Sequence, residues 1–213
     1  MEASNTDCMV RFLFILTLTL STLAHAQTDS ARMDILKFHD ELNEEFKNPK
    51  TSPLKGKDLK RFKHHEFFPV DLRYRVLAAI EVTPSSAFFQ MPTSSADMKD
   101  YRVYGTITFE LLGKKFQVPV YQSKMLMSVP KYKSYLFFPF TDLTNGTLTY
   151  GAGRYLELSI PEAGNIFILD FNKAYNPYCA YSDGYSCPLV PAENNLDVEI
   201  LAGVKYVSKK KKH

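Results

Sequence analysis

The chain has 213 residues, of which 45% are hydrophobic and 23% charged, and this composition is typical of a folded globular protein. Its 26 basic and 23 acidic residues give a net charge of only +3. Many of the lysines lie in "LKGKDLKRFKHH" and in the terminal "SKKKKH". A nucleic-acid surface needs a stronger basic face with more interleaved aromatic residues, so we expect no nucleic-acid partner.

The first 26 residues predict a secretory signal peptide. Arg11 precedes the apolar run "FLFILTLTLSTL" at 12–23, and "AHA" ends at Ala26. The run is short for a membrane span, and no second long apolar segment follows it. We therefore expect cleavage after Ala26 and a periplasmic or secreted mature chain that has no transmembrane segment. The alternative is an amphipathic or membrane-anchoring helix.

Residues 27–66 predict a helix followed by a connecting loop. From Asp29 to Lys47, apolar and aromatic residues recur at steps of three and four, and Pro49 ends the pattern. The predicted stripe consists of Ile35, Phe38, His39, Leu42 and Phe46. The loop "TSPLKGKD" precedes one further helical turn that reaches Phe62.

Residues 67–207 predict a β-rich domain, because the hydrophobic period changes to two, and residues 208–213 form a basic tail. The predicted strands are 74–82, a hairpin over 102–122 with its turn near Gly113 and Lys114, 133–140, a pair at 154–160 and 165–171 around "PEAG", and 197–207. Strands at short spacing without intervening helices predict a mainly β fold, an antiparallel barrel or sandwich with the N-terminal helix packed on it.

Two cysteines remain in the expected mature chain, Cys179 and Cys187, since Cys8 belongs to the predicted signal peptide. In an oxidising compartment this pair favours a disulfide, which would stabilise the fold by about 2–3 kcal/mol. One alternative is a thiol nucleophile with a histidine as its base. A zinc site lacks the second close pair of ligands, so we expect no metal. No dinucleotide, phosphate-loop or nucleophile-elbow motif occurs, and we expect no cofactor.

Polar residues gather at the predicted strand ends. These candidate ligand-binding residues are Asp142, Tyr150, Arg154, Asp170, Asn172 and Asn176. In one interpretation Arg154 pairs with Asp170 or Asp142, and the asparagines satisfy turn backbones. In the other, the group lines a shared pocket in which Arg154 holds an anion and Asp170 is a hydrogen-bond acceptor or general base. The tyrosines of 175–185 either pack at the rim of a sheet or line a ligand site.

Several blocks resemble one bacterial family of unknown function, DUF1684. They are "FFPVDLRYRV", "YGTITFEL", "PFTDLTNGTLTYGAGRYLEL", "DFNKAYNPYCAY", "SCPLVPAENNL" and "AGVK", spread between Phe67 and Lys205. The family has no agreed activity, so the resemblance implies no catalytic residue. It does imply that the signature blocks include all six candidate residues, together with Thr149, Tyr175, Cys179, Cys187 and Asn194.

The sequence thus favours an exported domain that binds a small polar or anionic molecule near 149–155 and 170–176. One alternative is a hydrolase-like enzyme that uses Asp170 and Arg154, or a Cys179 thiol. Another is an envelope interaction protein without a pocket. Neither the identity of the ligand nor an oligomeric state is predicted.

Overall fold

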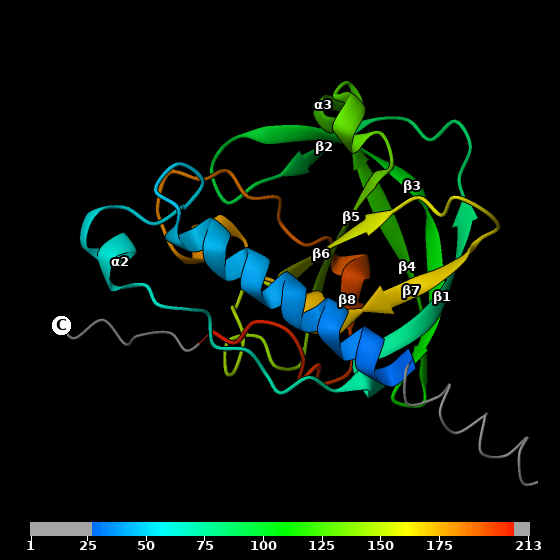
Figure 1. Cartoon of the computed structure of the whole chain (residues 1–213). Helices are drawn as coiled ribbons and strands as arrows, with labels where there is room; N and C mark the ends of the chain where they lie inside the picture. The colour runs from blue at the N-terminus through cyan, green and yellow to red at the C-terminus, as the bar shows by residue number, and fades with distance from the viewer. Residues whose placement is uncertain (1–26, 207–213) are drawn as a thin grey trace, which may run out of the picture.

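An eight-stranded sheet curls into a half-barrel in the computed structural model, which describes residues 27–206 (Figure 1). Hydrogen-bonded neighbours follow the order β6-β5-β4-β3-β1-β7, with β2 added to β3 and β8 to β5. All of these pairs are antiparallel except β5–β8. The predicted fold class, a mainly β fold carrying an N-terminal helix, is confirmed.

The strands are β1 (Arg75–Val82), β2 (Phe89–Pro92), β3 (Met98–Leu111), β4 (Lys114–Ser123), β5 (Tyr135–Asp142), β6 (Arg154–Ser159), β7 (Ile166–Asp170) and β8 (Asn195–Leu196). The helices after the N-terminal one are α2 (Gly56–Arg61) and α3 (Lys124–Met127). Short 3₁₀ turns are η1 (Leu72–Tyr74), η2 (Pro130–Tyr132), η3 (Phe171–Lys173), η4 (Tyr178–Ala180) and η5 (Ala192–Asn194). The predicted signal peptide and basic tail lie outside the described residues.

The N-terminal helix covers residues 27–47 and packs on the half-barrel through its predicted apolar stripe. Ile35, Leu42 and Phe46 are buried, as a period of 3.6 residues requires for one face. His39 lies on the same face, and its Nε2 is 2.8 Å from the carbonyl oxygen of Asn172. The helix is thereby attached to the turn η3 that follows β7.

The long hairpin of β3 and β4 confirms the predicted turn. Leu112 and Gly113 both have positive φ, 50° and 79°, as a two-residue loop between twisted strands needs. The register runs from Leu111 opposite Lys114 to Tyr101 opposite Ser123. This hairpin forms the middle of the sheet, so both strands have neighbours on each side.

The prediction that 154–160 and 165–171 pair with each other is wrong. β6 pairs with β5 and β7 pairs with β1, so the two strands are opposite edges of the sheet. Alternating hydrophobicity identifies a strand, but it holds no information about the neighbour of that strand. Side chains of the N-terminal helix and of both edges line a common surface hollow, and Figure 1 shows the helix crossing in front of β6 and β7.

The predicted last strand, 197–207, is also wrong. Only Asn195 and Leu196 pair as a strand, and the chain from 197 to 206 is mostly irregular. Its alternating residues Val198, Ile200 and Ala202 are nevertheless buried, because this extended segment enters the half-barrel. β2 was not predicted, since "FQMP" is short and mostly exposed.

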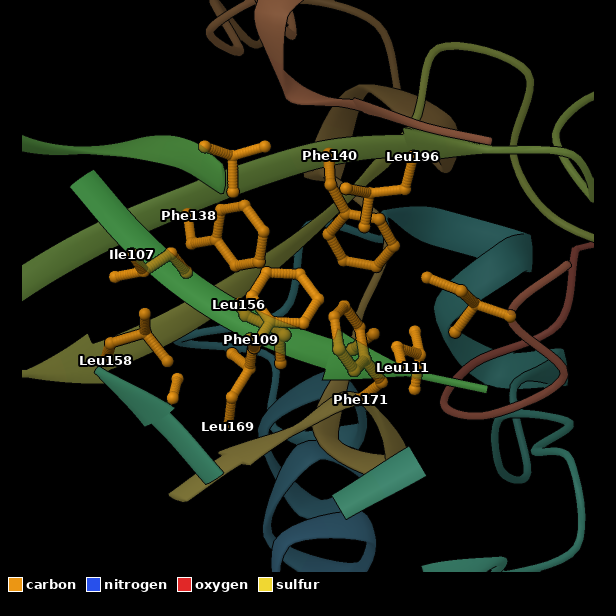
Figure 2. Packing of buried hydrophobic residues seen from close by; sticks show 14 of the residues in the cluster. Ile107, Phe109, Leu111, Phe138, Phe140, Leu156, Leu158, Leu169, Phe171 and Leu196 are labelled. Carbon is orange, nitrogen blue, oxygen red and sulfur yellow. The ribbon is translucent and has the colours of Figure 1, made fainter. Parts of the chain in front are cut away.

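The main core fills the concave side of the sheet (Figure 2). Phe138 and Phe140 from β5 meet Phe171 from η3 there, with ring centroids 6.3 and 5.3 Å from that of Phe171. Phe137, which precedes Phe138, faces the other side of β5 and belongs to a second cluster with Tyr101, Tyr121 and Tyr155. β5 is therefore buried on both faces, which explains its continuous apolar sequence "YLFFPF".

Candidate functional site

A pocket of about 380 Å³ lies on the convex side of β6, opposite the main core. We call it the tyrosine pocket. Its walls are the second half of the N-terminal helix, the outward side chains of β6, and the segment 175–188, with Lys99 from β3. The polar and aromatic side chains that line it include Glu45, Lys99, Tyr155, Glu157, Tyr175, Tyr178, Tyr185 and Cys187.

The alternation of β6 creates this arrangement. Leu156 and Leu158 point into the main core, so Tyr155 and Glu157 must point to the other face. The segment after β7 then returns over that face, where Tyr155 and Tyr175 exchange two backbone hydrogen bonds of 2.9 and 3.1 Å. Tyrosine side chains from two distant parts of the sequence thus meet in one wall.

The polar groups of the tyrosine pocket are mainly carboxylates that accept from phenols. Tyr175 Oη donates to Glu157 Oε1 at 3.0 Å, and Tyr178 donates to Glu45. Lys99 Nζ donates to the carbonyl oxygen of Ser186 at 2.6 Å, which fixes part of the segment 175–188.

Burial shifts the pKa values of these groups toward their neutral forms. It raises the pKa of the Glu157 carboxyl, although the Tyr175 hydrogen bond opposes the change. The side chain of Glu157 nevertheless remains accessible to solvent where it lines the pocket. Burial and Glu45 raise the pKa of Tyr178, so its hydroxyl is protonated and donates at neutral pH.

The predicted residue Arg154 points away from this pocket, into the main core. Its side chain is 0% exposed, and Nη2 forms an ion pair with Asp142 Oδ2 at 2.8 Å. Nη2 also donates to the carbonyl of Ile200 at 2.9 Å, and Nη1 donates to the carbonyl of Ala202 at 2.5 Å. The guanidinium therefore anchors the irregular segment that enters the half-barrel, as in the interpretation where Arg154 pairs with Asp142.

Both carboxylate oxygens of Asp142 bind groups of this buried network. Its Oδ1 accepts from the backbone and hydroxyl of Thr144 at 2.9 and 2.6 Å and from the backbone of Ile200 at 3.3 Å. Nearby, Gly153 has a φ of +94°, and a Cβ there would lie 2.6 Å from the carbonyl oxygen of Phe140. The backbone at Gly153 thus lies directly against β5.

Asp170 lies elsewhere, at the end of β7. Its Oδ2 accepts from Arg75 at 3.0 Å, and its Oδ1 accepts from the backbone and side chain of Asn172. Asn172 also bonds both backbone groups of Asp71, at 3.0 and 2.9 Å. These residues join η1, η3 and the start of β1, and the structure does not bring Asp170 to Arg154.

Asn176 and Tyr150 border the segment 175–188. Asn176 Nδ2 donates to Tyr181 Oη at 2.9 Å, while its Oδ1 is buried without a partner. Tyr150 lies against the Cys179 thiol and packs on Tyr206 with ring centroids 5.2 Å apart. Two of the six predicted residues line hollows: Tyr150 lines a second pocket on the other side of this segment, and Asp170 lines the surface hollow beside the N-terminal helix.

The cysteines are neighbours in space, and both are free thiols in this structure. The backbone N–H of Cys179 donates to Cys187 Sγ at 3.3 Å. The predicted disulfide therefore has its two partners side by side, and its formation stays a prediction.

Two features are absent from residues 27–206. No three His, Cys, Asp or Glu side chains in this range gather into a metal-ligand set. None of the helices there has both the length and the apolar character to cross a bilayer.

Sequence reasoning missed Glu45, Lys99, Tyr155 and Glu157. A signal existed in "RYLELS", where Glu157 alternates with leucines and must oppose the core face. An outward carboxylate on a strand is ordinarily solvated, so the pattern does not show that other segments cover it. Among the tyrosines of 175–185, Tyr175, Tyr178 and Tyr185 line the tyrosine pocket, and Tyr178 and Tyr181 pack against a hydrophobic cluster around Phe46.

The chain is similar to a protein family and to a solved structure. No curated protein matches the chain. Its fold is similar to the solution NMR structure of the uncharacterized protein from gene locus rrnAC0354 of Haloarcula marismortui, with 30% identity and a TM-score of 0.67 over 84% of this chain and 96% of that one. The family described as "Protein of unknown function (DUF1684)" matches residues 60–205. The chain therefore belongs to the DUF1684 family, as its signature blocks predicted.

Proposed function

We propose that this protein binds a small organic cation, an aromatic ring that carries an alkylammonium group, in the tyrosine pocket. The observation that carries the proposal is the position of Glu157, a carboxylate on a wall that it shares with Tyr155 and Tyr175. Ring faces and a carboxylate attract an ammonium group together, through cation–π contacts and a charge-assisted hydrogen bond.

The size and lining of the tyrosine pocket support this ligand class. Its 380 Å³ falls in the range of roughly 300–1,000 Å³ that is common for small-molecule sites. Phe38, Leu42 and the tyrosine rings supply apolar surface for a ring, and the carboxylates supply a few placed polar contacts. This division between apolar wall and sparse polar groups is typical of ligand sites.

Charge favours a cation over an anion here. Glu45 and Glu157 contribute two carboxylates, whereas Lys99 is the one basic side chain that residues 27–206 contribute to the lining, and it already bonds Ser186. The binding of an anion by Arg154 would require an accessible guanidinium, and that of Arg154 is enclosed. We therefore keep the expectation of a polar ligand and assign it positive charge.

Phenethylammonium tests the proposal, with 3-phenylpropanoate as the anionic probe of similar size. The protein has no tryptophan, so its 13 tyrosines dominate its fluorescence and report on the pocket. We expect phenethylammonium to bind and Glu157→Gln to weaken it by about tenfold or more, because a hydrogen bond to a charged group contributes about 1.5–3 kcal/mol. Acidification should also weaken binding, since the raised pKa of Glu157 brings its protonation to a higher pH.

The control is Glu110→Gln, which neutralises an exposed carboxylate on β3 outside the pocket lining and should leave the affinity unchanged. Circular dichroism checks that both variants fold. Tighter binding of 3-phenylpropanoate, absence of binding by phenethylammonium, or equal affinity in folded Glu157→Gln would each reject the proposal.

Export is a separate part of the proposed function, and it is supported by the N-terminal sequence alone. Expression of the whole chain in a Gram-negative host should yield periplasmic protein that begins at Gln27, as peptide mass spectrometry can establish. Leu16→Arg together with Leu18→Arg interrupts the apolar run and should leave the uncleaved chain in the cytoplasm. Recovery of residues 1–26 on the native protein in the cytoplasm would contradict export.

A further inference from the structure

Cys179 and Cys187 lie on the wall between the tyrosine pocket and a second pocket of about 470 Å³, which we call the cysteine pocket. Cys187 lines the former and Cys179 the latter. Cys187 is held firmly by Ser94 next to β2: its backbone N–H donates to Ser94 Oγ at 3.1 Å, and its carbonyl accepts from the Ser94 backbone at 2.8 Å. Cys179 follows Tyr178 in the turn η4, and its backbone N–H donates a hydrogen bond to Cys187 Sγ.

The two thiols differ in access. Cys179 is partly exposed to the cysteine pocket, whereas Cys187 is 8% exposed. An attacking thiol in an exchange reaction must reach an external sulfur atom, and a resolving thiol must reach only the first cysteine. The structure meets both conditions: Cys179 is accessible enough to be the attacking thiol, and Cys187 lies close enough to Cys179 to be the resolving thiol.

The surroundings of Cys179 stabilise its thiolate. Hydrogen bonds from the Cys187 thiol, and then from the hydroxyls of Ser94 and Tyr150, lower the pKa of Cys179 to about 6. The same interaction with Cys179, together with burial, raises the pKa of Cys187. Burial raises the pKa of Tyr150 to about 12, so this hydroxyl keeps its proton and serves as a donor.

We propose that Cys179 and Cys187 form an exchange-active dithiol that reduces small disulfides, with Cys179 as the attacking thiol and Cys187 as the resolving thiol. This activity uses the cysteine pocket and does not depend on ligand binding in the tyrosine pocket. It gives the predicted disulfide a role as the oxidised product of a reaction.

The reaction has two steps. The Cys179 thiolate attacks one sulfur of a substrate R–S–S–R, forms a mixed disulfide Cys179–S–S–R and releases one thiolate RS⁻. Cys187 then gives its proton to that thiolate and attacks Cys179 Sγ, which forms the Cys179–Cys187 disulfide and releases the second RS⁻. Two protein thiols are oxidised and one substrate disulfide is reduced to two thiols.

The lining of the cysteine pocket indicates which disulfides react fastest. Asp97 and Asp183 line it among serine side chains, and its lining, all within residues 27–206, contains neither Lys nor Arg. A disulfide with cationic ends is therefore attracted, and one with anionic ends is repelled. Cystamine and 3,3′-dithiodipropionate are a suitable pair of probes, since they are of similar size and opposite charge.

The test starts from protein reduced with dithiothreitol and desalted. Wild-type protein should react with cystamine to give the internal disulfide and no lasting adduct, as intact-mass and peptide mass spectrometry can show. Cys187→Ser should stop at a stable cysteamine adduct on Cys179, whereas Cys179→Ser should give no adduct on the buried Cys187 in the same time. Cystamine should react faster than 3,3′-dithiodipropionate, and added salt should reduce the difference.

Alkylation of the wild-type protein keeps the proposal testable even if a variant misfolds. Iodoacetamide should modify Cys179 before Cys187, with a rate that reaches its plateau near neutral pH, whereas an ordinary thiol becomes more reactive up to a pH of about 8.5. First modification at Cys187, the pH profile of an ordinary thiol at Cys179, or a wild-type adduct that never cyclises would overturn the assignment.

Discussion

Replacement of Arg154 by Met should lower the free energy of unfolding by about 3–5 kcal/mol, the loss that is typical when one partner of a buried ion pair is removed. The substitution leaves the Asp142 carboxylate, whose side chain is 0% exposed, without its cation. It also removes the donors to the carbonyls of Ile200 and Ala202, which lie inside the half-barrel. Urea denaturation followed by circular dichroism measures the change.

Two further variants separate charge from packing. Asp142→Asn in the Arg154→Met background removes the unpaired charge and should restore part of the stability, because the two positions are coupled. Arg73→Met removes an exposed arginine from a surface ion pair with Asp71 and should have little effect. If Arg154→Met cost less than about 1 kcal/mol, the guanidinium would not be the anchor described above, and its role as a binding residue would regain support.

Acid should destabilise the protein through His65. Its ring is buried among Phe46, Phe62 and Tyr181, and Nε2 has no hydrogen-bond partner. Burial lowers the pKa of His65 from 6.5 to about 4. The neutral ring therefore stabilises the folded state fully above pH 6.5, and this contribution is lost as the pH falls from 6.5 toward 4. The loss approaches roughly 3 kcal/mol, since each unit of pKa difference corresponds to about 1.4 kcal/mol.

His65→Phe removes the titrating group and should flatten the dependence of unfolding free energy on pH between 6.5 and 4. Urea denaturation at a series of pH values gives this dependence for each variant. His64→Phe is the matched substitution at the adjacent exposed position. If His64→Phe flattened the profile and His65→Phe did not, the buried ring would not be its source.

Local sequence pattern predicted the strands but not how they pair. The alternation in 154–160 and 165–171 identified two strands correctly, yet these form opposite edges of the sheet. A strand's neighbours depend on the curl of the whole sheet, which no short segment encodes. The segment 197–206 shows the same limit, because its alternating residues enter the core while its carbonyls bond the Arg154 side chain.

The sequence by itself determined the helix at 29–47, most of the strands, a hairpin turn near Gly113, and the family, because each depends on local periodicity or on contiguous residues. It also singled out Arg154 and Asp142 as a possible ion pair, and the two cysteines as a possible disulfide or reactive thiol. Only the tertiary structure decided that Arg154 faces the core, that Glu157 faces a pocket, and that Cys179 is the accessible thiol. The physical reason is that burial and pKa depend on which distant segments cover a side chain, and those segments lie more than a hundred residues apart for Glu45 and Glu157.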